Sequence, residues 1–167
     1  EQPKDSYYPR IFAKTASLFS SATQMGAILA HADPAAEAAY HDYGYHLGMA
    51  FQIVDDILDF TGEESVLGKP VGSDLRQGTV TLPFFYFMQA NPNAAAIIAR
   101  LQAGDGQYDE TVAEIVEQVQ HSPAIEQARQ EACDFAGQAK ADLALLPDGP
   151  ERRALIDLAD FVVAREL

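Results

Sequence analysis

Three aspartates and a glutamine lie close together in one apolar stretch of the sequence, namely Gln52, Asp55, Asp56 and Asp59. At about 100° per residue, these four side chains share an arc of about 100° on one side of a helix. Carboxylates so close together repel one another, and placing them among large apolar residues costs free energy unless something compensates. We therefore predict that Asp55, Asp56 and Asp59 bind a divalent cation. Oxygen ligands without histidine or cysteine favour Mg²⁺, with Mn²⁺ as the alternative.

Basic residues are scarce near this acidic stretch, since no lysine or arginine occurs between Lys14 and Lys69. The absence of basic partners disfavours the simpler interpretation of a solvated, salt-bridged acidic helix face. Lys14 is followed by Thr15, and an ammonium beside a hydroxyl suits an anion, although a lysine there could also extend to solvent. Lys69 follows Gly68, and glycine permits close backbone approach to a phosphate. These residues predict an anion site next to the cation site.

The elements that must position these residues are helices. Apolar residues recur at helical spacing, and strand patterns are weak. Asp33 before Pro34 predicts a helix start, and Thr81 is expected to cap another helix that has Pro83 in its first turn. We expect helices at about 8–30, 34–59, from 81 onward, 92–103, 108–121, 123–146 and 150–165.

One long connection interrupts the helices at about 61–79. It contains four glycines, and connections of this length often form binding loops. We predict a flexible active-site loop there. The fold class expected for residues 1–167 is all-α, in a single helical domain.

Bulk composition narrows the possible functions. The formal net charge of −14, from 25 acidic and 11 basic residues, disfavours nucleic acid as a partner. No apolar run is long enough for a transmembrane helix. The single cysteine, Cys133, cannot form an internal disulfide, which fits the cytoplasm, and we expect it to be buried. We expect structural roles for the four histidines, and a first residue other than methionine suggests a fragment.

Four segments in this order resemble the motifs of the trans-isoprenyl diphosphate synthases, most closely the bacterial long-chain polyprenyl branch. They are Lys14-Thr15-Ala16, Phe51 to Asp59, Gly68-Lys69-Pro70 with Gly72 and Asp74, and Thr81-Leu82-Pro83. The resemblance implies the C-terminal half of an isoprenoid synthase-like helical bundle. It also implies a Mg²⁺-dependent prenyltransferase that joins isopentenyl diphosphate to an allylic diphosphate.

The resemblance implies a role for each matching residue. Asp55, Asp56 and Asp59 match the second aspartate-rich motif, which binds the metal. The residues that match positions holding the allylic diphosphate are Lys14, Thr15, Gln52 and Lys69, of which Lys14, Gln52 and Lys69 are the catalytic candidates. Family members are commonly homodimers, so a homodimer is expected.

Two departures from the family pattern limit these expectations. Thr79 stands where the family often has a further lysine, which puts one diphosphate contact in doubt. The other aspartate-rich motif and its arginine pair are not among these 167 residues. We therefore expect a fragment that is inactive alone. The alternatives are a non-catalytic regulatory subunit of the same fold and a simple acidic metal-binding module, although the latter would need none of the basic residues.

Overall fold

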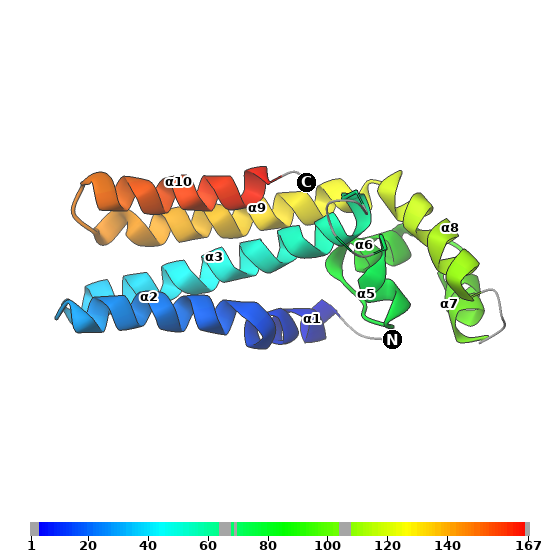
Figure 1. Ribbon diagram of the computed structural model, residues 1–167, viewed down its shortest axis with the longest axis horizontal. Coiled ribbons are helices and arrows are strands. Elements are labelled where there is room, and N and C mark those ends of the chain that lie inside the picture. Colours follow the sequence, from blue (N-terminus) through cyan, green and yellow to red (C-terminus); the bar gives the residue numbers. More distant parts are fainter. Residues whose placement is uncertain (1–3, 64–67, 69, 104–107, 166–167) are drawn as a thin grey trace. The chain divides into compact units, whose positions relative to one another are not determined.

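The computed structural model describes residues 4–63, 68, 70–103 and 108–165, and all regular structure within them is helical (Figure 1). This confirms the predicted all-α class. The elements, in chain order, are α1 (Lys4–Ile11), η1 (Phe12–Ala16), α2 (Ser17–Leu29), α3 (Pro34–Thr61), α5 (Ser73–Arg76), α6 (Leu82–Ala90), α7 (Ala94–Gln102), α8 (Tyr108–Gln120), α9 (Ala124–Asp142), η2 (Leu143–Leu145) and α10 (Pro150–Ala164).

Of the two helix caps predicted from the sequence, the one at Asp33 forms and the one at Thr81 does not. Asp33 caps α3 as predicted, because its Oδ1 accepts hydrogen bonds from the backbone N–H groups of Ala35 (3.0 Å) and Ala36 (2.9 Å). Thr81 occupies the N-cap position of α6, but its hydroxyl makes no capping bond. That hydroxyl is buried and has no hydrogen-bond partner among the described residues, so the predicted side-chain cap at Thr81 is wrong.

Two other segments differ from the regular elements expected. The first long helix contains a π-helical turn, η1, between α1 and α2. The predicted loop at 61–79 contains the short helix α5, while residues 64–67 and 69 lie outside the described part of the chain. The predicted flexibility of this loop therefore remains a prediction.

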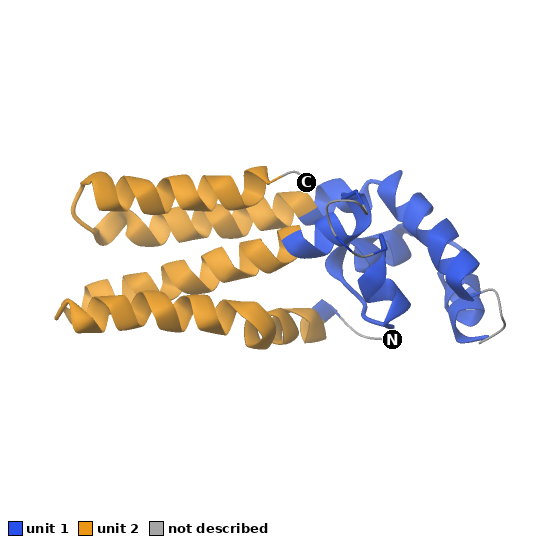
Figure 2. Ribbon diagram, viewed as in Figure 1, with its two compact units in different colours: residues 1–4, 55–128, 166–167 blue, residues 5–54, 129–165 orange. Residues whose placement is uncertain are grey.

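Contacts divide the chain into two compact units (Figure 2). Unit 2 comprises residues 5–54 and 129–165, and it contains α2, most of α3 and α9, and α10. Its core contains side chains from α3, α9, η2 and α10. Tyr43 lies fully buried in this core, and its hydroxyl donates a hydrogen bond to the carbonyl of Leu155 at 2.9 Å. Burial raises the pKa of Tyr43 from 10.0 to about 12, because the ionised form would lose its hydration.

Unit 1 comprises residues 55–128 together with Lys4. Its core gathers apolar side chains from the end of α3 and from α5 to α8. Val112, Ile115, Val116 and Val119 are all buried, so α8 packs one apolar stripe into this core. Gln120 Nε2 donates to the Phe60 carbonyl at 2.5 Å, so the end of α8 satisfies a carbonyl in the last turn of α3.

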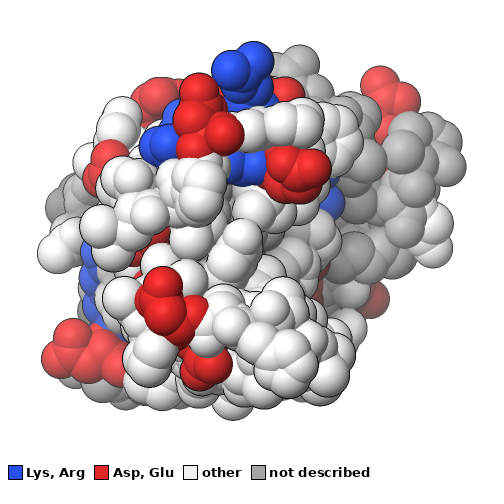
Figure 3. All heavy atoms as spheres, turned by 90° about the vertical axis from the view of Figure 1, so that its left-hand side faces the viewer, with Lys and Arg blue, Asp and Glu red and all other residues white. Residues whose placement is uncertain are grey.

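The surface of unit 2 includes the single cysteine. Cys133 is exposed, so the expectation of a buried cysteine is wrong; it occupies a solvent-facing position of α9, next to the buried Ala132. At the end of this unit where α2 connects to α3 and α9 to α10, acidic groups are scattered, and basic groups gather mainly along one edge (Figure 3). None of the described helices is long and apolar enough to cross a membrane.

Candidate functional site

In unit 2, the structure brings together two of the predicted diphosphate-binding residues, Thr15 and Gln52. The Thr15 hydroxyl donates a hydrogen bond to Gln52 Oε1 at 2.6 Å, although the two residues are 37 positions apart in the sequence. Gln52 is buried, with 2% of its surface exposed. Because its amide oxygen accepts from Thr15, the amide NH₂ group is the donor end of this side chain. A fixed amide donor can bind a phosphate oxygen.

The π-helical turn η1 carries both Lys14 and Thr15. Short π-helical insertions are rare and occur frequently at functional sites, because they redirect side chains relative to a regular helix. Lys14 is exposed, and Thr15 is half-buried against α3. The turn therefore carries an exposed lysine directly before the threonine that binds Gln52.

In unit 1, the three aspartates differ in exposure. Asp55 is exposed, whereas Asp56 and Asp59 are 3% and 1% exposed. All three lie on α3, and Asp55 and Asp59 are four residues apart, which places them on the same face of the helix. The solvent-accessible carboxylate of the group is thus that of Asp55.

Backbone groups of the connection after α3 bind Asp59 twice. The Asp74 N–H donates to Asp59 Oδ2 at 3.0 Å, and the Gly72 N–H donates to the Asp59 carbonyl at 2.7 Å. A hydrogen bond from a backbone N–H group fixes the orientation of a carboxylate. The segment at 72–74 is therefore a support for the carboxylate of Asp59, a role that sequence reasoning did not assign.

Gly72 makes this support possible. Its φ of 73° is in the left-handed region, and a Cβ there would overlap the Val116 side chain of α8. The sequence signal for this feature was the glycine itself, but its neighbour on α8 could not be read from the sequence.

The aspartates suit a magnesium ion in chemical type, since carboxylate oxygens are hard ligands. Among the described residues, however, no three His, Cys, Asp or Glu side chains are arranged to hold a metal ion between them. Magnesium commonly binds through one or two carboxylates and completes its shell with water and substrate phosphate oxygens. The donors present therefore fit an ion shared with a phosphate ligand better than an ion held by protein alone.

One predicted diphosphate-binding residue, Lys69, lies outside the described residues, and two other polar residues have structural partners. Arg76, a basic residue of the same connection, pairs with Asp109 of α8 at 2.5 Å, which gives it a structural partner. His46 Nδ1 lies 2.6 Å from Asp142 Oδ2 in unit 2, in line with the structural role expected for the histidines.

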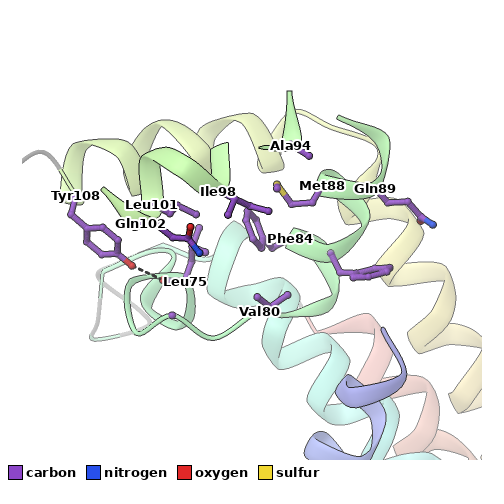
Figure 4. Close-up of a pocket in the computed structure, with 12 residues that line it drawn as sticks. Leu75, Val80, Phe84, Met88, Gln89, Ala94, Ile98, Leu101, Gln102 and Tyr108 are labelled. Atoms are coloured by element: carbon purple, nitrogen blue, oxygen red, sulfur yellow. Dashed lines mark hydrogen bonds between the residues drawn. The ribbon is translucent and has the colours of Figure 1, made fainter. Parts of the chain in front are cut away.

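Unit 1 also contains a cavity of about 590 Å³ between α5, α6, α7 and α8. Phe84, Met88 and Ile98 lie together in its wall (Figure 4). Its described lining residues include no Lys, Arg, Asp or Glu. A diphosphate would find no compensating charge there, so this cavity is not a candidate for the anion site.

Residues 2–119 match the family model for polyprenyl synthetase. The chain is 39% identical over 165 residues to octaprenyl diphosphate synthase of Escherichia coli (strain K12), covering 98% of this chain and 50% of that protein. Its structure is similar to heptaprenyl diphosphate synthase from Staphylococcus aureus, with a TM-score of 0.93, 34% identity and coverage of 99% and 51%.

It is also similar to polyprenyl synthase from Caulobacter crescentus CB15, described as complexed with calcium and isoprenyl diphosphate. The TM-score is 0.90 at 38% identity, with coverage of 99% and 51%. The chain thus spans about half the length of these relatives. These matches confirm the family resemblance seen in the sequence motifs. The chain belongs to the polyprenyl synthetase family.

Proposed function

We propose that this chain supplies the metal- and allylic-diphosphate-binding part of a chain-elongating isoprenyl diphosphate synthase. The observation that carries the proposal is the order of groups along α3. Gln52, held by Thr15, comes three residues before Asp55 in the sequence. An amide that can donate to an anion and a carboxylate that can bind a cation are, in this order, the residue types that the family resemblance assigns to a metal-bound diphosphate.

The reaction of such a synthase requires a leaving group to depart with its electrons. The bond between the allylic carbon and the diphosphate oxygen breaks, and the double bond of isopentenyl diphosphate attacks the resulting cation. Loss of a proton then forms the new double bond. Lys14, Lys69 and the amide of Gln52 would donate hydrogen bonds to the diphosphate oxygens, where negative charge develops. Thr15 would keep the amide of Gln52 in the donating orientation.

Asp55, Asp56 and Asp59 would hold Mg²⁺, or Mn²⁺, against the same diphosphate. A bound divalent cation neutralises the departing diphosphate and so lowers the barrier to ionisation. The calcium and isoprenyl diphosphate of the Caulobacter crescentus relative support a divalent cation. The exposed carboxylate of Asp55 is the one most accessible to an ion arriving with its ligand.

The 167 residues by themselves are expected to bind but not to turn over. They contain neither the other aspartate-rich motif nor the arginine pair that the resemblance implies. Holding both substrates in attack geometry can supply roughly 7–11 kcal/mol, and part of that contribution would be absent. A prenyl transfer assay on this chain should therefore give elongated product only when the complementary segment is supplied.

Calorimetry with inorganic diphosphate tests the binding proposal directly. We expect weak binding in the presence of Mg²⁺ and none in EDTA. Asp55→Ala should reduce the metal-dependent part, whereas Asp109→Ala is a matched control, since that exposed carboxylate pairs with Arg76. Equal binding with Mg²⁺ and with EDTA would contradict the metal roles of the three aspartates.

The alternative function is a non-catalytic regulatory subunit of the same fold. Mixing the chain with the complementary segment separates the two functions. Restored turnover that depends on Asp55 supports the catalytic role, and turnover indifferent to Asp55→Ala supports the regulatory one.

We further propose a homodimer located in the cytoplasm. Leu18, Met25 and Leu29 of α2 are 73%, 56% and 74% exposed, so this helix has apolar surface available for association. The exposed thiol of Cys133 is compatible with a reducing compartment. Sedimentation of the purified chain would test the dimer.

A further inference from the structure

Two glycines bring α3 unusually close to the preceding helical segment within unit 2. A Cβ on Gly48 would lie 2.6 Å from the Cα and 2.9 Å from the Cβ of Ala16. A Cβ on Gly44 would lie 2.6 Å from the Phe19 carbonyl oxygen and 2.7 Å from the Ser20 Cα. Carbon atoms in ordinary contact are about 3.5–4.0 Å apart, so neither position has room for a side chain.

The contact at Gly48 is adjacent to the proposed diphosphate-binding residues. Ala16, which is fully buried, is the last residue of η1 and directly follows Thr15. Gln52 is one helical turn after Gly48 on α3. The packing of Gly48 on Ala16 and the Thr15–Gln52 hydrogen bond are therefore successive layers of one helix contact.

From this geometry we infer that Gly48 is a positioning residue for the diphosphate end of the site. By lacking a side chain, it lets α3 approach η1 closely enough for Thr15 to hold the amide of Gln52. The inference rests on the proposed function, because it assigns a device to the same site.

The size of the displacement follows from the distances. Restoring an ordinary carbon contact at Gly48 requires the helices to separate by roughly 1 Å, from 2.6 Å to at least 3.5 Å. The nearest atom is backbone, which cannot rotate away as a flexible side chain could. The same separation applied to the 2.6 Å Thr15–Gln52 bond would lengthen it to about 3.6 Å, beyond hydrogen-bonding distance.

The other end of the helix contact fixes which way α3 can move. Thr23 Oγ1 donates to the Tyr40 carbonyl at 2.6 Å, one turn before Gly44. This bond holds the N-terminal half of α3 against α2. A methyl group at Gly48 would therefore push the α3 segment that carries Gln52 away from η1.

The test compares three alanine variants of the full chain. Gly48→Ala places a methyl group beside the Thr15–Gln52 layer. Gly44→Ala introduces the same kind of overlap one turn farther away, and it controls for lost stability. Gly137→Ala on α9 adds a methyl group that would have no described atom within 4 Å apart from its chain neighbours and the nearby backbone of its own helix, and it controls for the change in helix propensity.

Affinity for inorganic diphosphate with saturating Mg²⁺ is measured by calorimetry at a temperature where each variant is folded. We expect Gly48→Ala to weaken affinity about 10-fold or more, Gly44→Ala by less than about 3-fold, and Gly137→Ala not at all. Equal losses for Gly48→Ala and Gly44→Ala would overturn the inference, because both glycines would then serve packing alone.

A second measurement does not depend on ligand. The Gln52 side-chain amide signals can be assigned in NMR spectra through their loss in Gln52→Ala. We expect these signals to shift in Gly48→Ala and, in the same direction, in Thr15→Val. Unchanged amide signals would overturn the inference whether or not diphosphate binds. Absence of binding by the unaltered chain would instead count against the proposed function. Should Gly48→Ala not fold, Ala16→Ser enlarges the same contact from η1 and should shift the same signals.

Discussion

The Thr15–Gln52 hydrogen bond permits a quantitative prediction for Thr15→Val. Valine has nearly the shape of threonine, so the substitution removes the hydroxyl without opening a cavity. It leaves the buried amide oxygen of Gln52 without the donor that lies 2.6 Å away. Leaving a buried polar group without its donor costs about 1–3 kcal/mol, so the free energy of unfolding should fall by that amount.

The same substitution should weaken diphosphate binding. Thr15 orients the amide of Gln52, and once that orientation is lost the amide donor no longer points consistently at the ligand. We expect affinity for inorganic diphosphate with Mg²⁺ to fall about 10-fold, which corresponds to about 1.4 kcal/mol. Urea denaturation followed by circular dichroism gives the stability, and calorimetry gives the affinity.

Thr15→Ser is the matched control because it keeps the hydroxyl. Its affinity should stay within about threefold of the unaltered chain, with a smaller loss of stability. If the valine variant matched the unaltered chain in both measurements, the hydrogen bond would not support the site. If the serine variant were as weak as valine, the methyl group of Thr15 rather than its hydroxyl would be responsible.

Three further substitutions test other parts of the structure. Asp55→Ala in an assembled, active synthase should lower kcat at least about 10²-fold, which corresponds to roughly 3 kcal/mol. The free energy of unfolding should change by less than about 1 kcal/mol, because the side chain is exposed. Near-normal turnover would refute the metal role of Asp55. Alanine at either Gly72 or Gly78 should cost about 1–3 kcal/mol, because both glycines have a positive φ. Gly72→Ala should lower the free energy of unfolding by more than Gly78→Ala in urea denaturation, since only Gly72 contacts Val116. Equal losses would show that the contact with Val116 is unimportant. Tyr43 has a pKa raised from 10.0 to about 12, so it stays protonated in the folded chain at a pH where the unfolded chain ionises. Its contribution to the free energy of unfolding is fully present below pH 10 and is lost, on the order of 2–3 kcal/mol, as the pH rises to 12. Tyr43→Phe should remove that part of the pH dependence of stability, and an unchanged pH profile would contradict this prediction.

The position of most helices could be predicted because the signals for them are local. Asp33 and Pro34 start α3 through contacts within one turn, and the apolar period on α8 matches its buried face. The hydroxyl of Thr81 shows the limit of local signals. A capping residue type was present, but the burial of its side chain decided that no cap forms.

The aspartates could be predicted from the sequence as candidate cation ligands, but their different exposures could not be predicted. Helical geometry places Asp55, Asp56 and Asp59 on one side of α3, but which of them faces solvent depends on what packs against that helix. The return of the chain at Gly72 and Asp74 buries Asp59 and orients its carboxylate.

By itself, the sequence determined the residue types available for chemistry, their spacing along α3 and the family to which the motifs belong. These depend on covalent order and on the helical period, which are properties of neighbouring residues. Tertiary structure alone decided that Thr15 binds Gln52 and that the turn carrying Lys14 is π-helical. It also decided that Gly48 must lack a side chain. The Thr15–Gln52 bond and the constraint on Gly48 depend on contacts between segments more than 30 residues apart, and such contacts form only when the helices pack.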